Sequence, residues 1–263
     1  MDMGLNGKVA IVGGSSRGLG KATALALAEE GASLVICARN EKTLIDARTE
    51  ISNVGSGKVH SVVMDMSEHE DVTRLVKETI DTFGKVDILV NNAGGPPIGS
   101  PLNITESQWQ AAINQNLLSI VRLSRAVVPH MKDVGWGRIV NILSSSVKQP
   151  VDGLLLSNSV RMAVVGFAKT LADEVAPYNI TVNNILPGSI LTDRIKELDL
   201  SRSEQEGISL DDALSQRASN IPMGRIGRPE EFGAVACFLA SERASYITGV
   251  SIQVDGGALR SMY

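Results

Sequence analysis

The chain has 263 residues, of which 43% are hydrophobic, and this length suits one large α/β domain or two small ones. No apolar run approaches the roughly 20 residues that a membrane helix needs, and the first residues lack the pattern of a secretory signal. The 29 acidic and 25 basic residues are scattered and give a formal net charge of -4, whereas nucleic-acid-binding proteins more often carry a basic surplus.

Seven short apolar runs, most of which end at Gly, Asn or Asp, have the character of strands that are buried on both faces. In chain order they are Val9–Val12, Leu34–Ala38, Val59–Met64, Ile88–Val90, Arg138–Leu143, Ile180–Leu186 and Val250–Val254.

Helical patterns lie between these runs. The first, Gly18–Glu30, stops at the natural C-cap Gly31. Thr105 opens a capping box and a long helix toward Met131, a helix is expected from about Ser157 to Ala176, and Pro229 is a proline at a first helical position. The alternation predicts a single doubly wound, Rossmann-type α/β domain over residues 1–263. Its seven-stranded, mostly parallel sheet would carry helices on both faces.

One irregular insertion covers residues 193–222 and is polar, with weak helical signals around residues 194–198 and 210–218. Long connections in compact domains are usually functional. We interpret this insertion as a lid over a substrate, and a merely mobile connection is the alternative.

A glycine-rich turn, Gly14-Ser15-Ser16-Arg17-Gly18-Leu19-Gly20, follows the first strand directly and opens the first helix. Glycines let backbone N–H groups approach a pyrophosphate, and the helix N-terminus adds favourable partial charge. The position predicts a dinucleotide site. A structural turn, or a site for another nucleotide or a methyl donor, are the alternatives.

The wide spacing of these glycines is one of four features that resemble the short-chain dehydrogenase/reductase family. The others are Asn91-Asn92-Ala93-Gly94, Pro187-Gly188 and Val254-Asp255-Gly256-Gly257. The resemblance covers the chain from Asn6 to Gly257 and is greatest to the 3-oxoacyl-carrier-protein reductase branch. It implies an oxidoreductase that acts on a small-molecule carbonyl or alcohol, and a homotetramer.

The resemblance also implies which residues bind the cofactor. The glycine turn would hold the phosphates, Asp65 would face the adenine, Asn92, Ala93 and Gly94 would line the adenosine and ribose side, and Ile190 and Thr192 would meet the nicotinamide amide. The full predicted set is Gly14, Ser16, Arg17, Gly18, Leu19, Gly20, Arg39, Asp65, Met66, Asn92, Ala93, Gly94, Arg161, Ile190 and Thr192.

The end of the second predicted strand favours NADP(H) over NAD(H). An NAD enzyme usually carries an acid there to bind the ribose 2′-hydroxyl, but this slot is occupied by Ala38. Arg39 follows at once, and Arg17 lies in the glycine turn. Two guanidinium groups suit a 2′-phosphate by charge and by geometry.

The catalytic positions that the resemblance implies are only partly kept. Asn116 matches the family's asparagine and Ser144 its serine, although Ser145 and Ser146 follow and the match could shift. Where the family has Tyr-x-x-x-Lys, this chain reads Ser157-Asn158-Ser159-Val160-Arg161. A phenol has a pKa near 10, which nearby positive charge can lower, whereas an aliphatic hydroxyl is a far weaker acid.

Ser157 and Arg161 lie four residues apart and therefore share one helix face. Arg161 can hydrogen-bond ribose hydroxyls but stays protonated and cannot relay a proton. Three functions are compatible with this site. The chain is a reductase in which water, Ser157 or Lys148 supplies the proton, a catalytically impaired NADP(H)-binding protein that acts as sensor or assembly partner, or an enzyme for a reaction that needs no tyrosine.

Cys37 and Cys237 lie in apolar contexts without the spacing of metal ligands. We expect them to be reduced core residues of a cytoplasmic protein, and a disulfide between them is the alternative. No metal site is predicted.

Overall fold

The apolar runs form one seven-stranded sheet in the computed structural model, which describes residues 2–262. The strand order is β3-β2-β1-β4-β5-β6-β7, and every pairing between neighbours is parallel. The strands are β1 (Val9–Val12), β2 (Ser33–Ala38), β3 (Val59–Val63), β4 (Ile88–Asn91), β5 (Gly137–Ile142), β6 (Ile180–Pro187) and β7 (Ser251–Val254). The predicted fold class is thus confirmed, with bounds within one or two residues of those expected.

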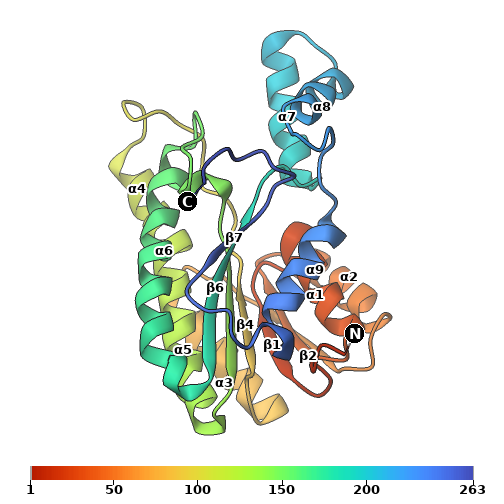
Figure 1. The fold of residues 1–263 in the computed structure, drawn as a ribbon, viewed down its shortest axis with the longest axis vertical. Coiled ribbons are helices and arrows are strands. Elements are labelled where there is room, and N and C mark those ends of the chain that lie inside the picture. The colour runs from red at the N-terminus through yellow and green to blue at the C-terminus, as the bar shows by residue number, and fades with distance from the viewer. Residues whose placement is uncertain (1, 263) are drawn as a thin grey trace.

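Helices cover both faces of the sheet (Figure 1). One face carries α1 (Gly18–Glu29), α2 (Glu41–Ser52) and α9 (Pro229–Leu239), and the other carries α3 (His69–Phe83), α5 (Ser119–Val134) and α6 (Leu155–Val175). Alternate strand residues face the two layers: Val12, Ile36 and Val90 pack toward the first, and Ile11, Val35 and Leu89 toward the second. No helix within residues 2–262 combines the length and apolarity needed to cross a bilayer.

The long helix expected from Thr105 is interrupted. The capping box at Thr105 is present and opens α4 (Glu106–Ile113), but a π-helical segment, Asn114–Leu118, separates α4 from α5. π-segments within helices are rare and occur often at functional sites. This one carries Asn116.

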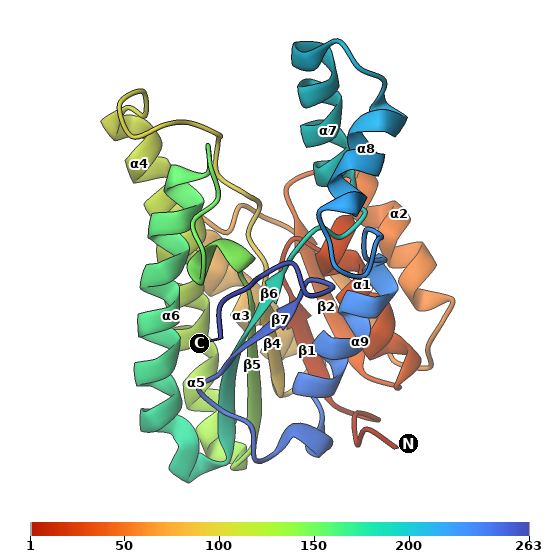
Figure 2. The same ribbon diagram turned by 45° about the horizontal axis from the view of Figure 1, so that its top comes forward.

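The insertion at residues 193–222 is more helical than its sequence indicated. It forms α7 (Asp193–Glu206) and α8 (Leu210–Ser219), which project beyond the carboxyl ends of the strands (Figure 2). Asp199 of α7 is fully buried and pairs with Arg217 of α8, whose guanidinium also donates to Ser189 Oγ at 3.3 Å. This buried pair joins the two helices to the loop after β6.

A ladder of polar side chains crosses the middle of the sheet. Asn91, Asn141, Asn184 and Ser251 occupy matching positions on β4, β5, β6 and β7. Each amide donates to its neighbour, at 2.8 Å from Asn91 to Asn141, 2.9 Å from Asn141 to Asn184 and 3.1 Å from Asn184 to Ser251. Because buried polar groups are costly without partners, the ladder favours this register of strands.

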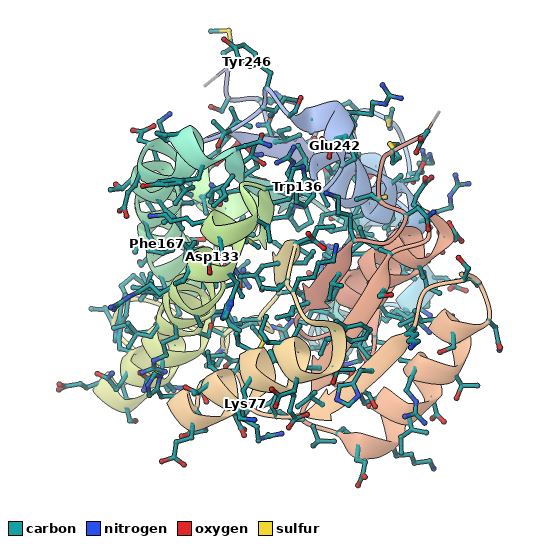
Figure 3. The ribbon with its side chains drawn as sticks, turned by 90° about the horizontal axis from the view of Figure 1, so that it is seen from below. Lys77, Asp133, Trp136, Phe167, Glu242 and Tyr246 are labelled. Carbon is teal, nitrogen blue, oxygen red and sulfur yellow. The ribbon has the colours of Figure 1, made fainter. Side chains whose placement is uncertain are left out.

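At the amino ends of the strands, charged groups surround Trp136 (Figure 3). Lys8 Nζ lies 3.5 Å from the centre of the Trp136 ring, and the Arg138 guanidinium lies 4.4 Å from it. Glu242 lies 3.7 Å from both cations. This cluster stabilises the end of the sheet opposite the glycine turn.

Candidate active site

The glycine turn has the shape that close approach to a phosphate group requires. Gly14 and Gly18 have φ of +55° and +59°, the left-handed region that favours glycine. A Cβ on Gly20 would collide with the carbonyl oxygen of Gly14, and one on Gly14 would lie 2.6 Å from Asn92 O. The turn is thus a backbone cradle that side chains would fill, and it opens α1, which has no acid in its first turn.

Two side chains hold this cradle in place. Ser15 is fully buried, and its Oγ donates to Val12 O at 2.9 Å and accepts from the N–H of Cys37 at 3.0 Å. Asn92 Nδ2 donates to the carbonyl oxygens of Gly13 and Gly14 at 3.2 Å each. The cradle is therefore fixed to β1, to β2 and to the loop after β4. Ser15 escaped the sequence prediction because its role depends on contacts across the sheet.

The two arginines that the sequence predicts for the 2′-phosphate, Arg17 and Arg39, have exposed side chains. Arg39 follows β2 and its guanidinium is 3.9 Å from Asp65, while Arg17 faces α7, 4.0 Å from Asp193 and 3.7 Å from Glu197. Both are thus engaged with carboxylates of other segments.

The resemblance assigns Asp65 to the adenine of the cofactor, and in the structure Asp65 and Met66 lie shortly after the end of β3. Asp65 Oδ1 accepts from the N–H and the hydroxyl of Ser67 at 2.9 and 2.8 Å. The end of the Met66 side chain lies 3.0 Å from where a Cβ of Gly13 would be. Met66 therefore packs directly on the glycine turn.

Asn116 is brought to the loop after β4 by the π-segment. Its side chain is 1% exposed, and Nδ2 donates to Gly94 O at 2.7 Å. Its Oδ1 has no partner within the described residues. An unpaired buried acceptor is unusual, and it leaves Asn116 able to accept a hydrogen bond.

Three serines meet at the carboxyl end of β5. Ser144 Oγ accepts from the N–H of Ser146 at 3.1 Å and so caps a short 3-10 turn, Ser145–Val147. Ser146 Oγ lies 3.2 Å from Ser157 Oγ on α6, and both side chains are almost fully buried. Ser144 is half-buried. The sequence favoured Ser144 and allowed a shift by one residue, so it missed Ser146, because nothing in the run of serines tells which hydroxyl faces α6.

Arg161 lies one turn after Ser157 on α6 and is 6% exposed. Its Nη1 donates to Ile142 O at 3.1 Å and its Nη2 to Ala93 O at 3.4 Å. Nε has no partner, and no carboxylate pairs with the guanidinium among residues 2–262. Burial lowers its pKa from 12.5 to about 10. The group remains a cation at neutral pH, between the loop after β4 and the end of β5.

The remaining predicted positions flank the cradle. Ile190 is 4% exposed and pairs with Gly227 in an isolated bridge, and Thr192 is the N-cap residue of α7. The Thr192 methyl lies 3.7 Å from where a Cβ of Gly18 would be. Lys148 follows the 3-10 turn and is half-buried, and no ion pair involves it in the described part of the chain.

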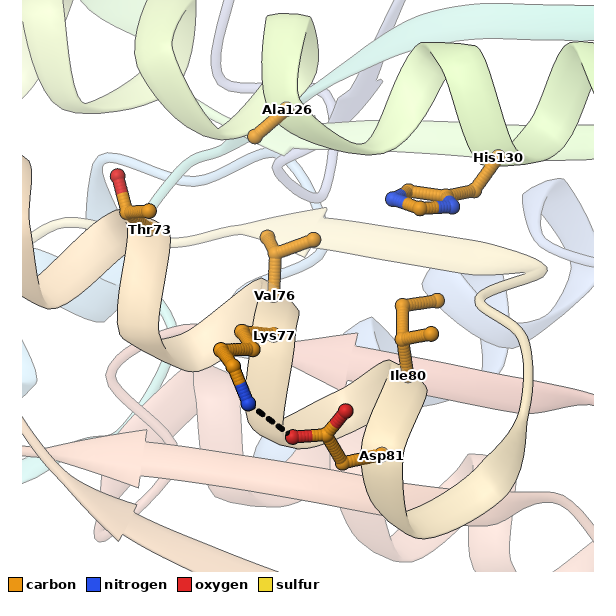
Figure 4. Close-up of a pocket in the computed structure, with 7 residues that line it drawn as sticks. All are labelled: Thr73, Val76, Lys77, Ile80, Asp81, Ala126 and His130. Atoms are coloured by element: carbon orange, nitrogen blue, oxygen red, sulfur yellow. Dashed lines mark hydrogen bonds and ion pairs between the residues drawn. The ribbon is translucent and has the colours of Figure 1, made fainter.

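One hollow in the described part of the chain lies away from these residues (Figure 4). It measures about 370 Å³, lies between α3 and α5, and is lined by Thr73, Val76, Lys77, Ile80, Asp81, Ala126 and His130. None of the predicted site residues lines it. The site therefore rests on the convergence of residues at the carboxyl ends of the strands, where parallel sheets bind ligands.

Comparison with known proteins gives matches over almost the whole chain. The family model described as enoyl-(acyl carrier protein) reductase matches residues 14–258. The 3-oxoacyl-[acyl-carrier-protein] reductase of Vibrio cholerae is 36% identical over 255 residues, which are 97% of this chain and 98% of the relative. The NADPH-dependent reductase BacG of Bacillus subtilis is 34% identical over 256 residues, 97% of this chain and 99% of that protein.

A solved structure is also similar over the full length. The L-sorbose reductase of Gluconobacter frateurii, complexed with NADPH and L-sorbose, has a TM-score of 0.96 and 36% sequence identity, with 100% of both chains covered.

Proposed function

Because the chain belongs to the short-chain dehydrogenase/reductase family, we propose that it is an NADP(H)-dependent oxidoreductase that interconverts a carbonyl and an alcohol by means of an atypical proton donor. The observation that carries the proposal is the position of Arg161. This buried cation has no carboxylate partner among residues 2–262 and lies between the loop after β4 and the end of β5, four residues after Ser157, where the family has a tyrosine.

The chain's own residues suit the cofactor. The Gly14–Gly20 cradle would hold the pyrophosphate through backbone N–H groups, and Arg17 and Arg39 would bind the 2′-phosphate. The absence of an acid at Ala38 removes the usual partner of an unphosphorylated ribose. Bound NADPH supplies hydride chemistry, which belongs to the nicotinamide.

The protein's task is to bind the substrate oxygen and deliver a proton to it. Ser144 would donate a hydrogen bond to that oxygen, and Arg161 would stabilise negative charge there. Positive charge in a desolvated site counts for more than in water. Ser157 and Ser146, which are in hydrogen-bond contact, would pass a proton from water, with Lys148 as the alternative source.

Proton transfer by a positioned side chain typically contributes about 10²–10⁴-fold. A hydroxyl pair would supply less than a phenol does, so we expect slow turnover. Substrates whose reduced oxygen is a weak base would be favoured.

The test is NADPH oxidation with a panel of ketones, quinones and β-ketoacyl esters. Ser144→Ala and Arg161→Met should each lower turnover at least about 10²-fold, the size of effect seen when one oxyanion donor is lost. Ser159→Ala is the matched control, because Ser159 is an exposed serine on the same helix.

The second candidate is a catalytically impaired NADP(H)-binding protein that acts as sensor or assembly partner, and the missing phenol favours it. If NADPH binds and no carbonyl of the panel is reduced, this candidate replaces the enzyme. If neither NADPH nor NADH raises the thermal stability of the protein, both proposals are wrong.

We further propose the assembly and setting that the resemblance implies, a cytoplasmic homotetramer, and a lid role for α7 and α8 over a small-molecule substrate. Their position beyond the carboxyl ends of the strands supports the lid (Figure 2).

A further inference from the structure

Arg17 bridges the glycine turn and the first helix of the insertion. Its Nη1 lies 4.0 Å from Asp193 Oδ2 and 3.7 Å from Glu197 Oε1. These two acids are four residues apart on α7 and so lie on one face of the helix. The adjacent contact of the Thr192 methyl with the Gly18 position, at 3.7 Å, shows that the start of α7 lies directly on the turn.

Arg17 and Arg39 leave the backbone on neighbouring segments. Ser15, two residues before Arg17, bonds through its N–H to Cys37 O at 3.1 Å, and Cys37 is two residues before Arg39. The bases of the two arginine side chains therefore lie on neighbouring segments at one edge of the cradle. Arg17 nevertheless extends toward α7, where the two carboxylates are.

We propose that Asp193 and Glu197 are specificity-determining residues for the cofactor: they hold Arg17 on α7, compete with the 2′-phosphate for its guanidinium, and thereby couple the lid helix to a phosphorylated nucleotide. The proposal rests on the NADP(H) site proposed above and adds a second partner for one of its two arginines.

The competition follows from the chemistry of the guanidinium group. Both carboxylates face one nitrogen of the guanidinium, Nη1. A 2′-phosphate that takes a bidentate pair of N–H donors including those of Nη1 displaces these contacts, and a helix α7 that keeps Nη1 lowers the affinity for the phosphate. By thermodynamic linkage, the bound 2′-phosphate weakens the contact of Arg17 with α7 by the same factor by which that contact weakens binding of the phosphate.

The solvent exposure of these three side chains determines how strongly the carboxylates compete with the 2′-phosphate. The side chains of Arg17, Asp193 and Glu197 are 67%, 60% and 55% exposed, and exposed ion pairs are weak. Removing one carboxylate should therefore raise the affinity for a 2′-phosphorylated nucleotide by about 2- to 5-fold, and salt should reduce the difference.

The experiment is a double-mutant cycle read by calorimetric binding to the apoprotein. The probe is adenosine 2′,5′-bisphosphate, and 5′-AMP is the same ligand without the 2′-phosphate. Glu197→Gln should bind the bisphosphate about 2- to 5-fold more tightly than the wild type and bind 5′-AMP unchanged. In an Arg17→Gln background, Glu197→Gln should have no effect on either ligand.

One control variant isolates the contact. Glu204→Gln removes an exposed acid from the same helix, and no ion pair joins Glu204 to Arg17 within the described residues. This variant should not change the preference for the bisphosphate. In the wild type, the bisphosphate should also speed amide hydrogen exchange in residues 193–206 relative to 5′-AMP.

The outcomes separate this inference from the proposed function. If the effect of Glu197→Gln persists without Arg17, it is a general field effect and the inference is wrong. It is also wrong if Glu197→Gln acts equally on both ligands or on neither. If the wild type shows no preference for the bisphosphate over 5′-AMP, the NADP(H) assignment itself fails.

Discussion

Replacing Arg39 with glutamine tests the cofactor assignment most directly. Arg39 directly follows Ala38, the last residue of β2. Ala38 occupies the position at which an NAD enzyme usually has an acidic residue. Glutamine keeps a polar side chain of similar reach and removes the charge. The variant should therefore lose affinity for NADPH and keep its affinity for NADH.

The expected loss of binding free energy follows from the two partners of Arg39, which are Asp65 in the free protein and the 2′-phosphate in the complex. A hydrogen bond to a charged group contributes about 1.5–3 kcal/mol. Arg39 must first leave Asp65, 3.9 Å away, and with Arg39 73% exposed this pair contributes only about 0–1 kcal/mol. The net loss is about 0.5–3 kcal/mol, so the Kd for NADPH should rise about 2- to 150-fold.

Calorimetric titration of both nucleotides provides the assay, with Arg48→Gln as the control because Arg48 is an exposed arginine on α2. We expect the Kd for NADH to change less than about twofold, since the removed charge faces a group that NADH lacks. An equal loss for both nucleotides, or none for NADPH, would refute the assignment of Arg39 to the 2′-phosphate.

Three further predictions concern buried groups. Because burial lowers the pKa of Arg161 to about 10, the native state loses that proton before the unfolded state does. The unfolding free energy of the wild type should therefore rise by about 1 kcal/mol relative to Arg161→Met between about pH 9 and about pH 11, in paired denaturant titrations. Asn141→Leu should lower the unfolding free energy by about 2–4 kcal/mol in urea, because the buried Asn184 Oδ1 loses its donor. Burial raises the pKa of both Cys37 and Cys237 to about 12, so a maleimide should label neither thiol at neutral pH until the protein unfolds. Rapid labelling of the native protein would contradict that expectation.

The strand–helix order could be predicted from the sequence because it is a local property. Continuous apolar runs such as Val9–Val12 occur where both faces of a strand are covered. Glycines at Gly14 and Gly18 mark positions that need positive φ whatever surrounds them. The sequence also predicts that Ser157 stands where the resemblance implies a tyrosine, because a substitution inside a long gap-free match is visible in the chain itself.

Side-chain partners across the sheet could not be predicted. The contact between Ser146 and Ser157, the bonds from Arg161 to the carbonyls of Ala93 and Ile142, and the bridge from Arg17 to α7 all join residues that are distant in the chain. Which hydroxyl or carboxylate a side chain reaches depends on the packing of helices on the sheet.

The amino-acid sequence by itself determined the fold class and the position of the glycine turn, because backbone geometry and apolar periodicity are local. Tertiary structure alone decided that Arg161 is a buried cation with no carboxylate partner among residues 2–262 and that Arg17 contacts α7. Burial and charge pairing depend on segments that are distant in the chain, such as those of Arg17 and Glu197, and the fold brings these segments together.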